Sequence, residues 1–334
     1  SSALTLCRQA IAKSWLSVEL SRRNPVEFAN AIIMDANEIT MNTTPSNAPI
    51  VVSTDFSEEA AIAVERAAQI AKRLAAPLYV FHVFNSGIWA SLKNIYSSAM
   101  WTGTDLAVTV REQLSQTVAD LATRFGIKVI AESETGSVTE KIAEFVVTSG
   151  ARLLVIGGRS ENWVADLLVG ETALQLISEI EIPVLVARND PARPPTNLLV
   201  ATDFSEGAQR AASIAWQLFP TARLTLLHAC LIPFEGRMRL AGATGADIEG
   251  YRHTERTKAE AEMNKQIAAL GGSNRAEGVV AWGVPTPVIL EHAASGTDMI
   301  VIGRHGGGFT NERLLGSVAR NVLFHATCDV FLAP

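Results

Sequence analysis

The chain has 334 residues, of which 48% are hydrophobic and 19% charged, enough for two globular domains with separate cores. Its net charge of -6 supplies no basic surface for a phosphate backbone, so we expect no nucleic-acid partner. No stretch approaches the roughly 18 to 20 apolar residues of a membrane-spanning helix, so we expect no membrane partner. Cys7, Cys230 and Cys328 lack the spacing of a disulfide framework or zinc site, which favours a cytoplasmic location.

Residues 1–48 have no counterpart elsewhere in the chain and little apolar periodicity. We interpret them as an N-terminal extension that is disordered or does not belong to the native protein. Met41 precedes a polar segment and then an apolar run, so one hypothesis is that the native protein starts there. The alternative is a flexible arm or an arm that docks a partner, and the sequence leaves both open.

An internal repeat organises the remaining sequence. The segment Ile50-Val-Val-Ser-Thr-Asp-Phe-Ser-Glu-Glu-Ala60 matches Leu198-Leu-Val-Ala-Thr-Asp-Phe-Ser-Glu-Gly-Ala208. Two further pairs of apolar segments follow in the same order: 78–82 with 224–228, and 153–157 with 299–303. The proline-rich segment 190–196 lies between the copies and reads as a linker. We therefore predict one domain over 49–189 and a second over 197–334.

Within each copy, short apolar runs alternate with longer amphipathic segments, which is typical of α/β domains built on a parallel sheet. Ser57 and Ser205 stand where the N-caps of the first helices belong. Because parallel strands bring their carboxyl ends to one edge of the sheet, Asp203, His228 and the loop after Gly303 should converge there. This edge is the predicted ligand site.

A spaced glycine motif in the second copy carries the chemistry. It reads Gly303-Arg-His-Gly306, then nine residues, then Gly316-Ser317, with a strand before it and helical apolar spacing after it. Glycine lets the backbone approach phosphate oxygens, and a helix N-terminus attracts an anion. Ser317 could cap the helix or donate to phosphate. The alternative is a surface loop in which the glycines only add flexibility.

This motif resembles the G-x2-G-x9-G-[ST] nucleotide signature of the universal stress protein family, as does the Thr-Asp-Phe-Ser-Glu opening of each copy. The resemblance covers residues 49–334. It implies two tandem Rossmann-like domains, similar to adenine nucleotide α-hydrolases, each a mostly parallel five-stranded sheet flanked by helices. It also implies that the last strands pair, through 182–186 and 330–332, into an internal pseudo-dimer; a further homodimer stays open. Family members carry a proline where this chain has Asp329, a change expected to affect the sheet edge rather than the pocket.

The resemblance assigns roles to residues of the second copy. It places Asp203, which follows Thr202, beside the adenosine end of the ligand, and gives the backbone of Ala229 a contact with adenine. Ribose and phosphates would be bound by the glycine signature, namely Gly303, Gly306, Gly316, Ser317 and the N–H of Val318. We interpret Arg304 and His305 as cations for the β- or γ-phosphate, with a solvated loop as the alternative. The expected ligand is ATP or AMP, with Mg²⁺ accompanying ATP.

The first copy departs from this signature, because it reads Gly157-Gly-Arg-Ser160, nine residues, then Gly170-Glu171-Thr172. We hypothesise that the Glu171 carboxylate fills the anion site of its own domain. The alternative is that Glu171 points to solvent and the site is only weakened. His82 and His228, at equivalent strand ends, are interpreted as structural residues, and no catalytic residue is assigned.

The sequence thus predicts a cytoplasmic stress-response or signalling protein that binds an adenine nucleotide in its second domain. Hydrolysis should be slow at most, because the chain lacks the GxxxxGK[ST] loop of committed nucleotide hydrolases. Residues 232–250 are expected to be irregular and could cover the site. The alternative function is an interaction scaffold that binds no nucleotide.

Overall fold

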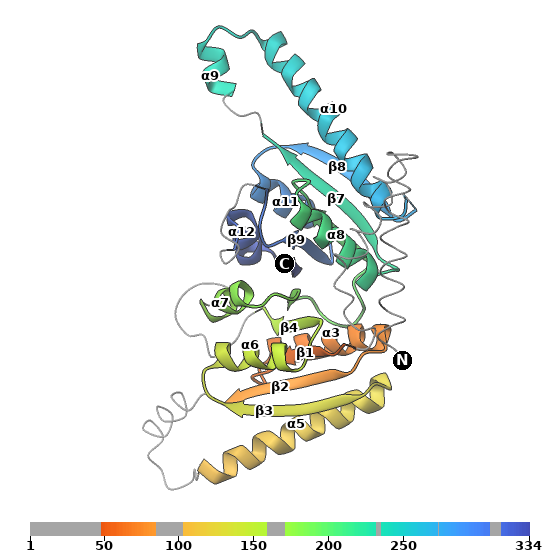
Figure 1. The fold of residues 1–334 in the computed structure, drawn as a ribbon, viewed down its shortest axis with the longest axis vertical. Helices are drawn as coiled ribbons and strands as arrows, with labels where there is room; N and C mark the ends of the chain where they lie inside the picture. The colour runs from red at the N-terminus through yellow and green to blue at the C-terminus, as the bar shows by residue number, and fades with distance from the viewer. Residues whose placement is uncertain (1–47, 85–102, 159–170, 232–234, 273, 308–314) are drawn as a thin grey trace, which may run out of the picture. The chain divides into compact units, whose positions relative to one another are not determined.

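A computed structural model describes residues 48–84, 103–158, 171–231, 235–272, 274–307 and 315–334 of the chain (Figure 1). The N-terminal extension lies outside these residues, apart from its last position.

Strands and helices alternate along both copies, which confirms the predicted α/β class. The first copy contains β1 (Ile50–Ser53), α3 (Glu58–Leu74), β2 (Leu78–Phe84), α5 (Gly103–Phe125), β3 (Val129–Thr135), α6 (Val138–Thr148), β4 (Leu153–Gly157), α7 (Glu171–Glu179) and β5 (Val184–Ala187). The second contains β6 (Asn197–Ala201), α8 (Glu206–Leu218), β7 (Arg223–Cys230), α9 (Glu235–Leu240), α10 (Gly245–Ala269), β8 (Ala276–Trp282), α11 (Pro285–Ala293), β9 (Met299–Gly303), α12 (Ser317–His325) and β10 (Asp329–Ala333). The expectation that 232–250 is irregular is wrong, because α9 and the start of α10 occupy most of it.

All the described strands belong to one ten-stranded sheet, in the order β3-β2-β1-β4-β5-β10-β9-β6-β7-β8. Strands within each copy are parallel, whereas β5 and β10 pair antiparallel and join the two copies. Their register opposes Val330 to Val186 and Leu332 to Val184. The last strands therefore pair as predicted, and each domain contributes a five-stranded parallel half.

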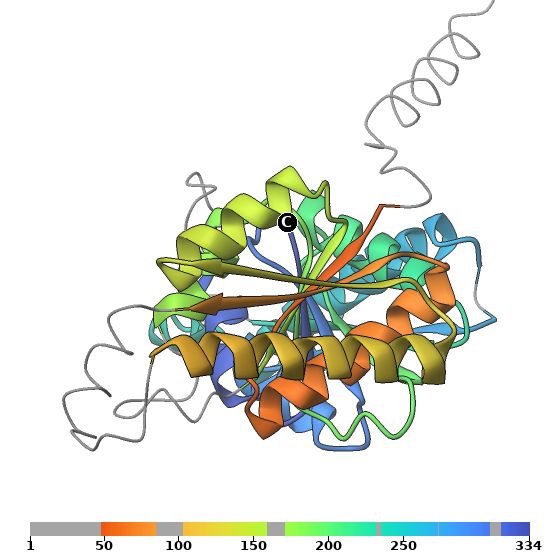
Figure 2. The ribbon, with the colours of Figure 1, turned by 90° about the horizontal axis from the view of Figure 1, so that it is seen from below.

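Helices cover both faces of the sheet. One face carries α3, α5, α8 and α10, and the other carries α6, α7, α11 and α12. Figure 2 shows this division in the first domain, where α6 lies on one side of the strands and α3 and α5 lie on the other. Strands β4, β5, β9 and β10 are buried along nearly their whole length, which explains their continuous apolar runs.

Each domain starts with the same tight strand-to-helix turn. The predicted caps form: Ser57 Oγ accepts from the N–H of Ala60 at 3.2 Å, and Ser205 Oγ accepts from the N–H of Ala208 at 3.3 Å. The preceding residues Phe56 and Phe204 adopt left-handed backbone conformations, with φ of 66° and 64°. Bulky residues rarely adopt this conformation, so the turn is held by its surroundings. It sets the loop after the first strand at the carboxyl edge of each half-sheet.

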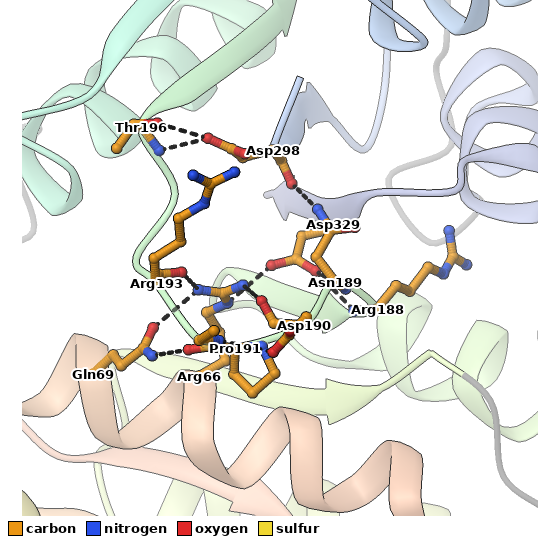
Figure 3. A network of polar contacts seen from close by, with 11 residues as sticks. Arg66, Gln69, Arg188, Asn189, Asp190, Pro191, Arg193, Thr196, Asp298 and Asp329 are labelled. Carbon is orange, nitrogen blue, oxygen red and sulfur yellow. Dashed lines mark hydrogen bonds and ion pairs between the residues drawn. The ribbon is translucent and has the colours of Figure 1, made fainter. Parts of the chain in front are cut away.

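The linker between the copies is bound to the first domain by Arg66 and Gln69 of α3 (Figure 3). The Arg66 guanidinium donates to the carbonyl oxygen of Arg193 at 2.8 Å and to that of Asp190 at 3.4 Å. The Gln69 amide donates to the carbonyl oxygen of Pro191. A segment without regular structure thus has its backbone acceptors satisfied by side chains of one helix.

Asp329, which replaces the family proline, lies on the central strand β10, in the position that Pro183 takes in the first copy. Its carboxylate is fully buried and accepts hydrogen bonds from the N–H groups of Arg188 at 2.7 Å and Asn189 at 2.8 Å. Arg66 of the first domain approaches its other oxygen (Figure 3). The expectation that Asp329 acts at the edge of the sheet is wrong, since it lies where the domains and linker meet.

Candidate functional site

A pocket of about 340 Å³ lies at the carboxyl ends of β6, β7 and β9, against the N-terminus of α12. It brings together every residue that the sequence nominated in the second copy: Thr202, Asp203, Ala229, Gly303, Arg304, His305, Gly306, Gly316, Ser317 and Val318. These residues come from four separate segments of the chain. Their convergence follows from the parallel strand order, which places successive strand ends side by side.

The apolar wall of this pocket was not predicted from the sequence. This wall includes Leu227 and Ile302 from the sheet, together with Pro285 and Ile289 from α11. The α11 residues belong to no recognisable motif, so only the packing of α11 against the sheet reveals them. The pocket therefore combines a glycine-rich polar end with an apolar surface.

Asp203 binds the backbone of the glycine loop through its carboxylate. One carboxylate oxygen accepts from the N–H of Gly307 at 2.9 Å, and the other accepts from the N–H of Ser205 at 3.0 Å. Burial by itself would raise the pKa of Asp203, but the hydrogen bonds from Ser205 and Gly307 outweigh it and hold that pKa below its ordinary value. Asp203 is therefore ionised in the folded protein near neutral pH.

Close contacts explain two glycines of the signature. A Cβ on Gly306 would lie 2.5 Å from the carboxylate of Asp203, and one on Gly316 would lie 3.0 Å from the carbonyl oxygen of Arg304. The N–H of Gly316 donates to that same carbonyl oxygen at 2.7 Å. Glycine thus lets the backbone approach Asp203 and the carbonyl oxygen of Arg304 closely, whereas a Cβ at either position would force these neighbours to move.

The N-terminus of α12 opens on the pocket without a side-chain cap. Gly316 occupies the N-cap position and Ser317 is the first helical residue, so Ser317 does not cap the helix. Ser317, Val318 and Ala319 all line the pocket. In a helix the N–H groups of the first turn lack helical acceptors and carry the positive end of the dipole. This end of the pocket therefore suits an anion.

The Arg304 side chain does not take its predicted position. Its guanidinium is buried and turns to the first domain, where it donates to the carbonyl oxygens of Ile180 and, at 2.5 Å, of Ile182. Burial lowers its pKa to about 10, although nearby Glu181 opposes the shift. The expected contact between this side chain and a phosphate is wrong in this structure, because the guanidinium is bound to the first domain, although Arg304 is among the residues that line the pocket.

Both strand-end histidines hold the turns beside them. The Nδ1 atoms of His82 and His228 each lie 2.8 Å from a carbonyl oxygen, that of Thr54 and that of Thr202 respectively. The His228 ring lies 4.4 Å, centroid to centroid, from the ring of Phe204 in its left-handed conformation. Burial lowers the pKa of His82, which favours its neutral form. These contacts fit the structural role predicted for both residues.

The equivalent end of the first domain also differs at a position that was not predicted from the sequence. Glu59 occupies the position of Gly207 and has a carboxylate oxygen that is buried without a hydrogen-bond partner among the described residues. Gly207 lies so close to the glycine loop that a Cβ there would be 3.2 Å from the carbonyl oxygen of His305. The Glu171 side chain and Ser160 lie outside the described residues, so the hypothesis on Glu171 stays a prediction.

No helix in the described part of the chain is long and apolar enough to cross a membrane. The same residues contain no group of three or more His, Cys, Asp or Glu side chains that could hold a metal ion.

Taken together, two α/β half-sheets joined through their last strands, with a glycine loop and an uncapped helix at the carboxyl edge, define a tandem Rossmann-like protein. The model of the universal stress protein family matches residues 47–188 and again 195–334. The chain therefore belongs to the universal stress protein family and contains two of its domains in tandem.

Some known relatives align with most of this chain, and others with less than half of it. A universal stress protein of Mycolicibacterium smegmatis is 26% identical over 294 residues, which is 85% of this chain and 96% of the relative. A crystal structure of a universal stress protein from Archaeoglobus fulgidus, 19% identical, aligns with a TM-score of 0.60 over 86% of this chain and 98% of its own. A universal stress protein solved in complex with cAMP is 27% identical over 42% of this chain and 97% of its own, with a TM-score of 0.32.

Proposed function

We propose that this protein binds ATP or another adenine nucleotide in its second domain and acts as a cytoplasmic stress-response or signalling protein. The observation that carries the proposal is the uncapped N-terminus of α12, which meets the glycine loop inside a pocket. Phosphates are the anions that such helix N-termini and glycine loops commonly hold. No nucleic-acid or membrane partner is proposed.

The pocket has the two chemical ends that a nucleotide requires. Phosphates would lie against Gly306, Gly316 and the first N–H groups of α12, while the base would lie against the apolar wall beside Ala229. Asp203, whose carboxylate is ionised, would accept hydroxyl hydrogen bonds from ribose. The volume falls within the range of about 300 to 1,000 Å³ that is usual for small-molecule sites. Mg²⁺ would accompany the phosphates of ATP.

We assign no catalytic residue, so hydrolysis would be slow at most. His228 lines the pocket, but its Nδ1 is bonded to the carbonyl oxygen of Thr202, which restricts the ring. Asp203 already accepts hydrogen bonds from two backbone N–H groups. A general base must reach the proton that it removes and have a pKa near the working pH, and the lowered pKa of Asp203 does not meet this requirement.

Native mass spectrometry of protein purified without added nucleotide, followed by calorimetric titration with ATP, AMP and GTP, tests the proposal. We expect one adenine nucleotide per chain and no binding by a variant carrying both Gly306→Ala and Gly316→Ala. GTP serves as the control for base selectivity. Absence of binding at millimolar ATP and AMP would overturn the proposal and favour the alternative, an interaction scaffold built on the paired domains.

A further inference from the structure

Each domain sends one arginine to the end of the other domain's last helix. Arg304, in the glycine loop of the second domain, donates to the carbonyl oxygens of Ile180 and Ile182, just beyond α7. Arg188, which follows β5 of the first domain, donates to the carbonyl oxygens of Leu323 and, at 2.8 Å, Ala326 at the end of α12. Cations at a helix C-terminus satisfy its free carbonyl groups and complement its dipole.

The two arginines do not occupy equivalent positions. The first-domain counterpart of Arg304 is Gly158, where an added Cβ would lie 2.3 Å from the side chain of Arg188. The counterpart of Arg188 is Pro334, which cannot donate a side-chain hydrogen bond. Among the residues that the structure describes, the arginine that crosses between the domains therefore belongs to the glycine loop itself only in the second domain.

The backbone of Arg304 ties the two halves of that loop together. Its N–H donates to the carbonyl oxygen of Ala333 at 2.9 Å, and its own carbonyl oxygen accepts from the N–H of Gly316 at 2.7 Å. Gly316 is the N-cap of α12, the helix whose N-terminus opens on the pocket. A shift of Arg304 would therefore move Gly303, Gly316 and the first turn of α12 together.

Burial makes the contact with the first domain hard to replace. Arg304 is only 5% exposed, and the carbonyl oxygens of Ile180 and Ile182 are the acceptors that the structure gives its guanidinium. A buried cation without partners is strongly unfavourable, so the side chain holds its position as long as α7 holds these carbonyls in place.

We propose that Arg304 is a positioning residue through which the first domain holds the second domain's pocket in its binding shape. The inference rests on the proposed nucleotide function for its ligand, but the mechanical link itself does not require nucleotide. By reciprocity, a ligand that tightens the glycine loop would also tighten the end of α7. The first domain, although its signature is incomplete, would thus act on binding in the second.

Amide hydrogen exchange of the full chain without nucleotide tests the link directly. In Arg304→Met we expect exchange at Gly316 and Gly307 to become at least about tenfold faster than in the unmodified protein. Arg188→Met is the matched control, because it removes the same kind of helix-end contact but leaves the glycine loop intact. Equal exchange at Gly316 in the unmodified protein and Arg304→Met, or equal acceleration by both variants, would overturn the proposal.

Titration with ATP provides a second test of the role of Arg304. We expect Arg304→Met to bind about tenfold more weakly, Arg304→Lys to be intermediate because it retains a buried donor, and Arg188→Met to stay within about twofold of the unmodified protein. ATP should also slow exchange over 176–182 in the unmodified protein but not in Arg304→Met. Unchanged affinity in Arg304→Met would contradict the inference.

The exchange and titration experiments distinguish failure of the inference about Arg304 from failure of the proposed nucleotide function. If the unmodified protein binds no ATP, the proposed function fails while the exchange measurement without nucleotide still decides whether Arg304 holds the loop. Arg304→Lys keeps the test decisive if Arg304→Met does not fold, because faster exchange at Gly316 is expected in Arg304→Lys as well, to a smaller degree. Unchanged exchange in Arg304→Lys would then overturn the inference.

Discussion

Arg66 of the first domain and Asp329 of the second form an ion pair of 3.0 Å, from Nε to a carboxylate oxygen, with side chains only 2% and 0% exposed. Each partner also bonds the chain between the domains: Arg66 through linker carbonyls and Asp329 through the N–H groups of Arg188 and Asn189. The pair therefore fixes the linker and both domains at one point (Figure 3).

Removal of one partner should be costly, because it leaves the other charge buried without compensation. We expect Arg66→Met to lower the free energy of unfolding by about 3 to 5 kcal/mol. The control is Arg124→Gln, which removes an exposed pair with Glu65 at 2.7 Å and should cost less than about 1 kcal/mol. Urea denaturation of both variants measures the difference, and equal losses would show that the buried pair has no special weight.

Two neighbouring glycines of the loop should respond differently to the same change. In Gly306→Ala the new Cβ would lie 2.5 Å from the Asp203 carboxylate, so this carboxylate must move and binding of ATP should fall at least about tenfold. In Gly307→Ala the nearest atom would be the Cβ of Ser205 at 3.6 Å, an ordinary contact, and binding should change little. Calorimetric titration of the pair decides; similar affinities would argue that the loop tolerates displacement of Asp203.

Glu59 of the first domain occupies the position of Gly207, and a glutamate at position 207 should close the pocket of the second domain. Gly207→Glu puts a carboxylate where even a Cβ would lie 3.2 Å from the carbonyl oxygen of His305, and adds negative charge near the proposed phosphates. We expect ATP affinity to fall more than about tenfold. Glu206→Gln, which alters the exposed neighbour, serves as control and should leave affinity unchanged. Retained binding in Gly207→Glu would exclude this position as a cause of the difference between the domains.

Asp203 should make stability depend on pH in the acid range. Its folded pKa is lowered, so its ionised form stabilises the fold at pH values above the unfolded pKa of about 3.9. This contribution is lost as the pH falls through the lowered folded pKa. We therefore expect the difference in unfolding free energy between the unmodified protein and Asp203→Asn to be constant from pH 7 to about 5 and to shrink below about 4. A difference that stayed constant down to pH 2.5 would contradict this assignment.

Local periodicity, the internal repeat and the glycine motif were sufficient to predict the strand-helix units and the residues that converge on the pocket. The pairing of the last strands followed only from the family resemblance. The glycine spacing, for example, predicts that Gly303 and Gly316 lie at one edge of the sheet, because the carboxyl ends of parallel strands meet at the same edge.

The direction of the Arg304 side chain could not be predicted in this way. Within its own domain Arg304 is a cation in a phosphate-type loop, and only the antiparallel pairing of β5 with β10 brings Ile180 and Ile182 within reach. Asp329 is a similar case, because its partner Arg66 comes from the first helix of the other copy. Contacts between copies depend on long-range geometry that periodicity does not encode.

The covalent connection of β5 to β10 allows the two halves to differ. In a pair of identical chains, every substitution at this interface would appear twice, so a change in one half would always be accompanied by the same change in the other. Here one half has Gly158 and Pro183 where the other has Arg304 and Asp329. The single chain also holds its halves together at any dilution. Division of labour between a binding half and a supporting half therefore becomes open to selection in a way that a symmetric dimer does not permit.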